Sequence, residues 1–316
     1  MNGISTYCST FNLDFSETIA YNNPLFPTLI NYGMLSSYPD YAGVPHWHKD
    51  LEFIIIKKGH MTYNVNGELI PLNEGNGIMV NSRQLHYGFS PEHIECEFIC
   101  VLFSPELLSG NEWFYHNYME PVTENSLYPY LYLGEETWKN AILEKIDMLY
   151  SMYAAQSEQE PPYFALLDAF LAVMKLLYEN LDVNAYDMTK ESNELTSLRN
   201  MITYIEEHFA QRIALDNLAS SGACCKSRCS LLFKKYLRET PMTYIAKLRL
   251  RKSLVALLDS DKSIADIAYE YGFCGASYYC ETFQKYYGIS PLKYRKTLDK
   301  GESPCISHRQ LHRKLH

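Results

Sequence analysis

Long apolar runs are scarce in this 316-residue chain. The most apolar segment, YFALLDAFLAVMKLLY at 163–178, is interrupted by Asp168 and Lys175 and is shorter than the roughly 20 residues of a membrane-spanning helix. The first residues, MNGISTYCSTFNLDFS, contain neither a cationic start nor an apolar stretch, so no secretory leader is expected. These absences predict a cytoplasmic protein without a membrane partner, whose nine cysteines remain reduced thiols.

Basic residues are rare in the first part of the chain. Residues 1–194 contain 8 Lys and Arg against 26 Asp and Glu, a net charge of −18, whereas residues 195–316 contain 20 against 11, a net charge of +9. A positively charged segment attracts a polyanion such as nucleic acid, and a negatively charged segment repels it. The change of sign therefore predicts two domains with different partners. A purely solubilising surface would explain the acidic part, but less easily the change.

The spacing of apolar residues changes along the chain. Between residues 46 and 103, short runs rich in Ile, Val, Tyr and Phe are separated by turn residues at 66–67 and 75–77, which predicts β-hairpins. From Glu135 the period is helical, and a second helix is expected at 163–181. One face of the first helix is formed by Trp138, Ile142, Ile146 and Leu149. The predicted fold class is α+β, a β-rich N-terminal domain with a helical extension, followed by an all-α domain.

Two similar segments, about fifty residues apart, each combine a short apolar helix, a tight turn and a second helix. The downstream copy, SIADIAYEYGFCGASYYCETFQKYYGISPLKYR, contains Gly272, which is suited to the left-handed conformation that ends a helix. The upstream copy, IALDNLASSGACCKSRCSLLFKKYLRETP, has Gly222-Ala223 at its turn. A helix-turn-helix places its second helix in the DNA major groove. Two such units joined by a stiff helix at 244–260 predict a protein that reads successive major grooves of double-stranded DNA, with phosphate contacts from Lys234, Lys235 and Lys285.

A set of apolar, aromatic and basic positions runs through both copies and the helix between them: Tyr204-Ile205, Leu218-Ala219, Phe233-Lys234, Arg249-Leu250, Ile264, Ile267-Ala268, Gly272-Phe273, Ser277-Tyr278, Phe283, Gly288, Ser290-Pro291 and Tyr294-Arg295. In these positions residues 198–296 resemble the arabinose-operon regulator (AraC/XylS) family of bacterial transcription factors. The resemblance implies sequence-specific promoter binding and, most often, activation of transcription through contacts with RNA polymerase.

The resemblance also implies which side chains of the two second helices face the DNA. In the upstream copy these are Lys226, Ser227, Ser230 and Leu231, and Arg228 is placed to reach a phosphate or a base. In the downstream copy they are Ala276, Ser277, Tyr278, Cys280 and Glu281. At each position, contact with backbone or water alone is the alternative.

The chain departs from the family at three positions. Cys225 stands in place of the usual Ser at the start of the first reading helix, and it is a poorer cap. Gln284 stands in place of the usual Lys, which removes one phosphate contact. Tyr279 stands in place of the usual Phe, so its hydroxyl needs a hydrogen-bond partner.

The segment HWHKDLEFIII at 46–56 contains a cluster of ionisable residues. Because side chains alternate along a strand, His46, His48, Asp50 and Glu52 are expected on one face, and His86 follows on another predicted strand. The spacing His-x-His-x3-Glu-x6-Gly with a later His resembles the cupin β-barrel motif, which implies a sensor domain ahead of the DNA-binding domain. The second cupin motif departs from the pattern, with Asn81 and Arg83 in place of Pro and Gly.

Three roles are open for this cluster. The first is a pocket for an uncharged small molecule, lined by His46, His48, Glu52 and His86 with Trp47, Tyr63, Arg83 and Tyr87 at its mouth. The second is a site for iron, manganese or zinc, held by His46, His48, Glu52 and His86. The third is structural hydrogen bonding inside the barrel.

The two resemblances together predict five segments. These are a cupin-like β-barrel ligand-sensing domain at 1–105, a helical dimerisation or connector segment at 106–182, a linker at 183–197, a double helix-turn-helix domain at 198–298 and a flexible basic tail at 299–316. The expected function is a homodimeric transcription factor, not an enzyme, that responds to a small molecule. A sugar is one candidate, since Trp and Tyr stack on sugar rings. A metal-dependent cupin enzyme fused to a DNA-binding domain and a constitutive DNA-binding dimer are the alternatives.

Overall fold

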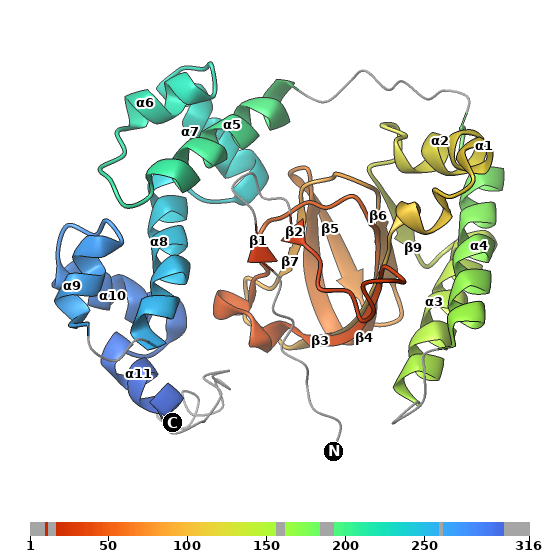
Figure 1. Cartoon of the computed structure of the whole chain (residues 1–316), viewed down its shortest axis with the longest axis horizontal. Coiled ribbons are helices and arrows are strands. Elements are labelled where there is room, and N and C mark those ends of the chain that lie inside the picture. Colours follow the sequence, from red (N-terminus) through yellow and green to blue (C-terminus); the bar gives the residue numbers. More distant parts are fainter. Residues whose placement is uncertain (1–9, 12–16, 156–161, 184–192, 259–261, 300–316) are drawn as a thin grey trace. The chain divides into compact units, whose positions relative to one another are not determined.

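The computed structural model describes residues 10–11, 17–155, 162–183, 193–258 and 262–299 (Figure 1). The chain divides into two compact units, one of residues 1–35 and 41–191 and the other of residues 36–40 and 192–316. No helix in the described part of the chain is long and apolar enough to cross a bilayer. The predicted basic tail, apart from Asp299, lies outside the described residues.

The first unit is built on a seven-stranded antiparallel sheet. Its strands are β3 (Thr28–Met34), β4 (Leu51–Val65), β5 (Glu68–Asn73), β6 (Gly77–Val80), β7 (His86–Phe89), β8 (Cys96–Phe103) and β9 (Tyr130–Leu133). The strand order is β3-β8-β4-β6-β9, and β5 and β7 also pair with β4. A separate pair is formed by β1 (Thr10–Phe11) and β2 (Glu17–Thr18). This sheet confirms the predicted β-rich cupin region.

The long strand β4 connects the two parts of the sheet. Its first residues pair with β6 and β8, and residues 60–65 pair with β5 and β7. The register shifts between Ile56 and Lys58, and such irregularities bend and twist a strand. Because of this bend, Glu52 near the start of β4 and Tyr63 near its end are hydrogen-bonded to each other.

The predicted turn after β4 is confirmed. Asn66 and Gly67 have φ angles of 51° and 87°, the positive values that a two-residue hairpin turn needs. The Asn64 side-chain oxygen accepts a hydrogen bond from the Gly67 amide at 2.8 Å and closes the turn.

Helices cover one face of the sheet. They are α3 (Thr137–Ala154) and α4 (Tyr163–Asn180), with the shorter segments η3 (Pro105–Leu108), α1 (Glu112–Phe114), η4 (Tyr115–Met119) and α2 (Glu120–Thr123) packed against the same core. Two further short segments, η1 (Leu35–Ser37) and η2 (Pro39–Tyr41), follow β3. Figure 1 shows α3 and α4 lying alongside the sheet. Phe53 of β4 and Ile146 of α3 belong to one core, in which Phe170 stacks on Phe103 with ring centroids 4.8 Å apart. Phe53 therefore points toward the helices, whereas its neighbour Glu52 points to the opposite face of β4.

The described residues of the second unit are helical from Asn193 onward. Its helices are α5 (Asn193–His208), α6 (Leu215–Ser221), α7 (Lys226–Leu237), α8 (Pro241–Leu258), α9 (Ile264–Glu270), α10 (Ala276–Tyr287) and α11 (Pro291–Asp299). Both ends of α8 are packed. Tyr244 lies edge-on to Phe233 of α7 with centroids 5.7 Å apart, and Leu257 shares a core with Phe283 of α10. The predicted all-α domain with two helix-turn-helix units joined by a stiff helix is present.

Several elements begin or end elsewhere than the sequence suggested. The expected strand at 46–56 begins only at Leu51, because the chain bends at Lys49 and Asp50. The hairpins were expected from residue 46 onward, but the sheet also includes the seven-residue strand β3 before that point. The segment 106–182, expected to be helical, contributes β9 to the sheet, since Tyr130–Leu133 alternates half-buried and buried residues.

The start of α5 also differs. It begins at Asn193, within the predicted linker. The sequence does not reveal this start, because the first turn is polar and has no apolar period that marks it as helical. The buried face of α5 comes after this turn, at Leu198, Met201, Ile202 and Ile205.

Candidate functional site

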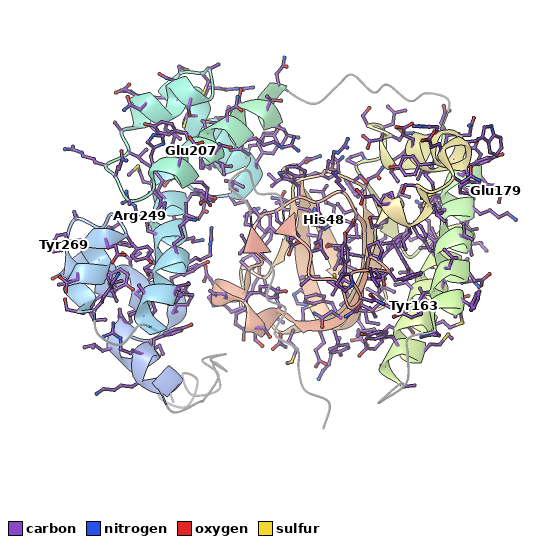
Figure 2. All side chains as sticks on the ribbon, in the orientation of Figure 1. His48, Tyr163, Glu179, Glu207, Arg249 and Tyr269 are labelled. Carbon is purple, nitrogen blue, oxygen red and sulfur yellow. The ribbon has the colours of Figure 1, made fainter. Side chains whose placement is uncertain are left out.

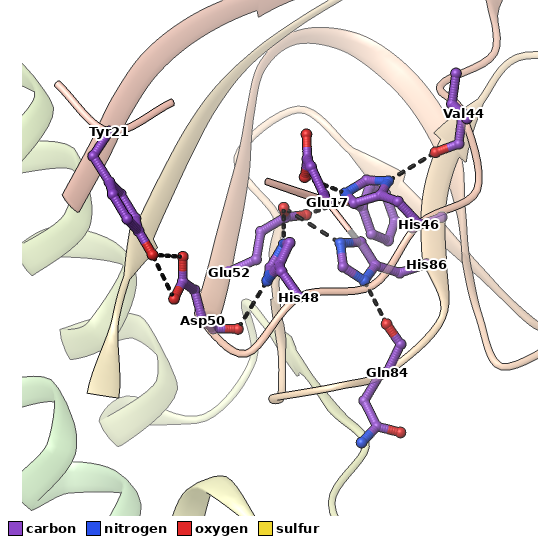
Figure 3. A network of polar contacts seen from close by, with 10 residues as sticks. Glu17, Tyr21, Val44, His46, His48, Asp50, Glu52, Gln84 and His86 are labelled. Carbon is purple, nitrogen blue, oxygen red and sulfur yellow. Dashed lines mark hydrogen bonds and ion pairs between the residues drawn. The ribbon is translucent and has the colours of Figure 1, made fainter. Parts of the chain in front are cut away.

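Four of the side chains singled out in the sequence meet inside the first unit. His46 and His48 precede β4, Glu52 lies on β4 and His86 begins β7. The backbones of His46 and His86 hydrogen-bond to each other in both directions, at 3.1 and 2.9 Å. One nitrogen or oxygen atom from each of the four lies within 4.8 Å of the others (Figure 3). Three of the four side chains are fully buried and His46 is half-buried.

Backbone carbonyl groups fix the orientation of the three imidazoles. The Nδ1 atoms of His46, His48 and His86 lie 2.7, 3.1 and 2.8 Å from the carbonyl oxygens of Val44, Asp50 and Gln84. A carbonyl oxygen only accepts, so each Nδ1 carries the proton and donates. In the neutral tautomer each Nε2 then offers a lone pair, and all three Nε2 atoms are directed toward the carboxylates at the centre of the cluster (Figure 3).

Glu52 is the anionic centre of the cluster. Its Oε2 lies 3.4 Å from Nε2 of both His48 and His86, and the Tyr63 hydroxyl donates to its Oε1. Burial alone would raise the pKa of Glu52, but the interactions with His86 and His48 outweigh it and hold this pKa well below its ordinary value. Conversely, burial lowers the pKa of His48, but the hydrogen bond and charge of Glu52 outweigh it and raise this pKa.

His46 differs from the other two histidines. Burial lowers its pKa to about 4, against the opposing charge of Glu17. At neutral pH His46 is therefore an uncharged imidazole, the form in which a histidine binds a metal ion or accepts a hydrogen bond.

Glu17 was not singled out in the sequence, yet it lies at the cluster. Its Oε2 is 3.2 Å from His46 Nε2, and its backbone N–H donates to the Trp47 carbonyl oxygen at 2.9 Å. Glu17 is buried although it belongs to the short strand β2. A single acidic residue in a turn-rich segment carries no signal that would have placed it here.

Two other predicted residues point elsewhere. The Asp50 carboxylate accepts hydrogen bonds from the Tyr21 hydroxyl at 3.0 and 3.2 Å (Figure 3), so the expectation that it shares the histidine face is wrong. Arg83 forms an ion pair with Glu124 at 2.6 Å and is half-exposed.

Tyr87 and Trp47 are the remaining residues of the predicted pocket mouth. Tyr87 is buried, and its hydroxyl accepts from the Asn64 amide at 3.3 Å. Trp47, which lies between His46 and His48 in the sequence, is half-buried.

The donor set fits a divalent metal ion. The 3.4 Å separations between Glu52 Oε2 and two imidazole Nε2 atoms are close to the ligand–ligand distance of a tetrahedral site with bonds of about 2.1 Å. His86 Nε2 is buried and makes no hydrogen bond within the described part of the chain. A buried, oriented imidazole nitrogen without a hydrogen-bond partner is a position that a ligand or metal could occupy.

In the second unit, the first helix-turn-helix consists of α6 and α7. At Gly222 an added Cβ would lie 2.6 Å from Met201 Cγ and 2.9 Å from the Ser197 carbonyl oxygen, so only glycine fits against α5. The left-handed residue of this turn is Ala223, with a φ of 50°. α7 begins after Cys225, whose side chain makes no capping hydrogen bond, as expected from its substitution for Ser.

The second helix-turn-helix consists of α9 and α10. The Ser263 hydroxyl caps α9 by accepting from the Asp266 amide at 3.1 Å. Gly272 takes the predicted left-handed conformation, with a φ of 79°. α10 begins after Gly275 and ends at Gly288, whose φ of 76° confirms the predicted stop.

The hydroxyl of Tyr279, the residue that stands in place of the usual Phe, has a hydrogen-bond partner. This oxygen lies 3.0 Å from Ser253 Oγ on α8. Because Ser253 Oγ donates its own proton to the Leu250 carbonyl oxygen at 2.7 Å, the Tyr279 hydroxyl is the donor in the first contact. A buried residue of the second helix-turn-helix is thereby bound to the connecting helix.

Two arginines that carry the family resemblance have structural contacts. Nε and Nη2 of Arg249, which is on α8 (Figure 2), donate to the carbonyl oxygens of Phe209 and Gln211, at 2.7 Å each. In the same way, Nε and Nη2 of Arg295 on α11 donate to the carbonyl oxygens of Leu257 and Lys262, at 3.2 and 2.9 Å. Arg249 thus holds the segment before the first helix-turn-helix against α8, and Arg295 holds the segment before the second against α11.

The predicted DNA-facing residues lie mostly on the outer faces of α7 and α10. On α7 all are exposed: Lys226, Ser227, Arg228, Ser230, Leu231, Lys234 and Lys235. On α10, Ser277, Tyr278, Glu281 and Lys285 are exposed, whereas Ala276 and Cys280 are half-buried. Leu231 and Tyr278 leave 52% and 48% of their surface in solvent, which gives both helices an apolar group on the outer face.

Comparison with known proteins agrees with this architecture. A helix-turn-helix domain model matches residues 218–297, and a cupin domain model matches residues 37–102. The chain is a transcriptional regulator of the AraC family in which a cupin domain precedes the helix-turn-helix domain.

Two curated relatives match most of the chain. The uncharacterised HTH-type transcriptional regulator YdeC of Bacillus subtilis is 29% identical over 255 residues, which cover 79% of this chain and 85% of YdeC. The HTH-type transcriptional activator RhaS of Mannheimia succiniciproducens is 27% identical over 255 residues, 79% of this chain and 88% of that protein. Among solved structures, apo ToxT from Vibrio cholerae is 14% identical, covers 86% of this chain and 97% of its own, and has a TM-score of 0.44.

Proposed function

We propose that this regulator is a cytoplasmic, sequence-specific DNA-binding activator that contacts RNA polymerase and responds to a small molecule bound in its cupin unit. The observation that supports this most is the pair of exposed faces on α7 and α10, fixed to opposite ends of α8. The activator role is inferred from the relative RhaS, which is named a transcriptional activator.

The length of α8 suits two neighbouring grooves. Its 18 residues span about 27 Å, and successive major grooves on one DNA face are roughly 34 Å apart. Exposed side chains such as Ser277 and Tyr278 would read base edges, and Lys234 and Lys285 would contact phosphates.

Selection of DNA by the full-length protein tests this proposal. Duplexes bound from a random pool at moderate salt should converge on one asymmetric site with two contacted segments about one helical turn apart. Footprinting with Tyr278→Ala should lose contacts in one segment only. A protein that prefers no duplex over random competitor would refute the proposal.

For the effector, we propose that it binds at the His46, His48, Glu52 and His86 cluster, with a sugar as one candidate. Tyr63 bonds to Glu52 and stacks on His86 with ring centroids 6.2 Å apart, so an aromatic surface and polar groups adjoin. A metabolite that raises the thermal midpoint of the full chain should also change its affinity for the selected duplex, because switching requires unequal affinity for two conformations. Equal DNA affinity with and without such a compound would refute the switch and favour a constitutive DNA-binding dimer.

A metal ion is a second candidate occupant, favoured by the three oriented Nε2 atoms. His46, His48, Glu52 and His86 would hold iron, manganese or zinc, and such an ion would supply a Lewis acid toward an oxygen atom of the effector. Calorimetry with Zn²⁺ should show one site that is weakened more than tenfold in His86→Ala and kept in His60→Ala, an exposed histidine of β4. Absence of binding to the unmodified protein would exclude a zinc site. The rival metal-dependent enzyme would in addition need turnover that is lost in His48→Ala.

Helix α4 is the proposed homodimer surface. Phe164 and Leu171, seven residues apart on one helix face, leave 94% and 37% of their surface in solvent, and Met148 of α3 leaves 44%. Sedimentation of Phe164→Glu should shift the protein toward the monomer. Leu25→Glu is the matched control, because Leu25 is 95% exposed outside these helices.

A further inference from the structure

The first turn of α5 carries a carboxylate that binds the basic flank of α7. Glu194 accepts hydrogen bonds from the Arg228 guanidinium, from Lys235 Nζ at 2.7 Å and from the Tyr236 hydroxyl at 2.7 Å. Arg228 and Lys235 are seven residues apart, so they lie on one side of α7, next to its outer face.

The helix packing does not depend on these ion pairs. α5 is already held by Leu198, Met201, Ile202 and Ile205, which are buried to 1% exposure or less. The pairs lie at the surface, where the side chains of Arg228, Lys235 and Glu194 are 44%, 48% and 25% exposed. Ion pairs at such exposure contribute little to stability. Stabilisation of the fold therefore does not explain why three donors converge on the two carboxylate oxygens of Glu194.

A carboxylate and a phosphate compete for the same donors. Both are anions that accept hydrogen bonds from Arg and Lys, and Arg228 and Lys235 flank the helix face that the proposed function places in the groove. The hydrogen bonds from Lys235 and Tyr236 lower the pKa of Glu194 to about 2, so it is an anion at every physiological pH.

The second reading helix lacks this contact. Lys285 occupies on α10 the place that Lys235 occupies on α7, and it forms no ion pair with any residue that the structure describes. A mostly exposed pair between Asp216 and Lys226 at 2.7 Å is another carboxylate contact on α7.

We propose that Glu194 is an autoinhibitory carboxylate that occupies the phosphate-binding groups of α7 in the free protein and must release them when α7 engages DNA. The inference rests on the proposed DNA-binding function. It predicts that the first helix-turn-helix binds DNA below its full strength, whereas the second is unrestrained.

The test is the affinity of the full-length Glu194→Gln variant for duplex DNA. The amide keeps the size of the side chain and still accepts from Tyr236, but loses the charge that holds Arg228 and Lys235. We expect affinity to rise about threefold to tenfold, the range for losing two competing surface ion pairs. The matched control is Glu207→Gln, which removes an equal charge from an exposed residue of α5 (Figure 2) and should change affinity less than twofold.

Two lysine variants add a comparison within the unmodified protein, which does not depend on how Glu194→Gln folds, and a second comparison in the Glu194→Gln background. In the unmodified protein, Lys235→Ala should cost less affinity than Lys285→Ala, because Lys235 is already engaged. In the Glu194→Gln background the cost of Lys235→Ala should grow, while that of Lys285→Ala should stay the same.

Equal effects of the Glu194 and Glu207 variants would overturn the inference, since Glu194 would then have no specific effect on DNA affinity. Weaker binding by Glu194→Gln would also overturn it, since Glu194 would then position Arg228 and Lys235 for DNA. These comparisons can be made on a non-specific duplex at low salt, because phosphate contacts do not depend on sequence. Loss of sequence preference in the unmodified protein would instead count against the proposed function.

Discussion

Replacing Arg249 with Ala should destabilise the first helix-turn-helix without removing a DNA contact. Arg249 donates two hydrogen bonds of 2.7 Å to the carbonyl oxygens of Phe209 and Gln211. A hydrogen bond from a charged group contributes about 1.5–3 kcal/mol when buried. The contact with Phe209 is partly buried and should contribute about 1.5 kcal/mol, whereas the exposed contact with Gln211 should add only about 0.5 kcal/mol, a total loss of about 2 kcal/mol. The freed carbonyls belong to the segment that leads from α5 into α6.

Hydrogen exchange measures this effect locally. Amides between residues 209 and 218 should exchange roughly 30-fold faster in Arg249→Ala, the factor that corresponds to about 2 kcal/mol. Arg249→Lys is the matched control, since it keeps the charge but cannot donate along two directions from one planar group, and it should show an intermediate rate. Unchanged exchange together with weaker DNA binding and a smaller salt slope would refute the reasoning and make Arg249 a phosphate contact.

The remaining predictions concern the reading helices. Lys234→Ala should weaken binding to every duplex and reduce the slope of log K against log salt by about 0.9, measured by titration at several salt concentrations; an unchanged slope would exclude a phosphate contact. Tyr278→Ala should weaken the selected site by about 1–3 kcal/mol relative to random DNA in competition binding, and equal losses on both duplexes would show that it reads no base. Tyr279→Phe should lower the free energy of unfolding by about 0.5–1.5 kcal/mol in denaturant titrations, with DNA affinity retained; a loss of affinity at unchanged stability would contradict its buried role.

Much of the second unit could be predicted from sequence because its turns constrain the backbone. Gly272 and Gly288 take left-handed φ angles that other residues rarely adopt, and each marks the end of a helix. The start of α5 could not be found in this way, since its first polar turn has no apolar period. The role of Arg249 was also hidden, because an arginine in a DNA-binding domain looks the same in sequence whether it contacts phosphate or a backbone carbonyl.

The cupin cluster was only partly predictable for a different reason. The spacing of His46, His48 and Glu52 pointed to three residues that the structure brings together, but strict alternation also included Asp50, which the bend before β4 turns away. Glu17 reaches His46 through tertiary structure alone. Residues brought together by folding, without a shared periodicity, leave no local pattern to read.

The sharing of α8 between two cores has a consequence for how this protein and its operator can change over time. Each residue inserted into an α-helix adds about 1.5 Å and rotates the downstream part of the helix by about 100°. A single insertion between Tyr244 and Leu257 would therefore turn one reading helix away from the groove while the other stayed in place. If both helices enter the DNA as proposed, operator spacing can change only in steps that keep them in phase, and we expect new target sites to arise from point substitutions on α7 and α10 and not from changes in length.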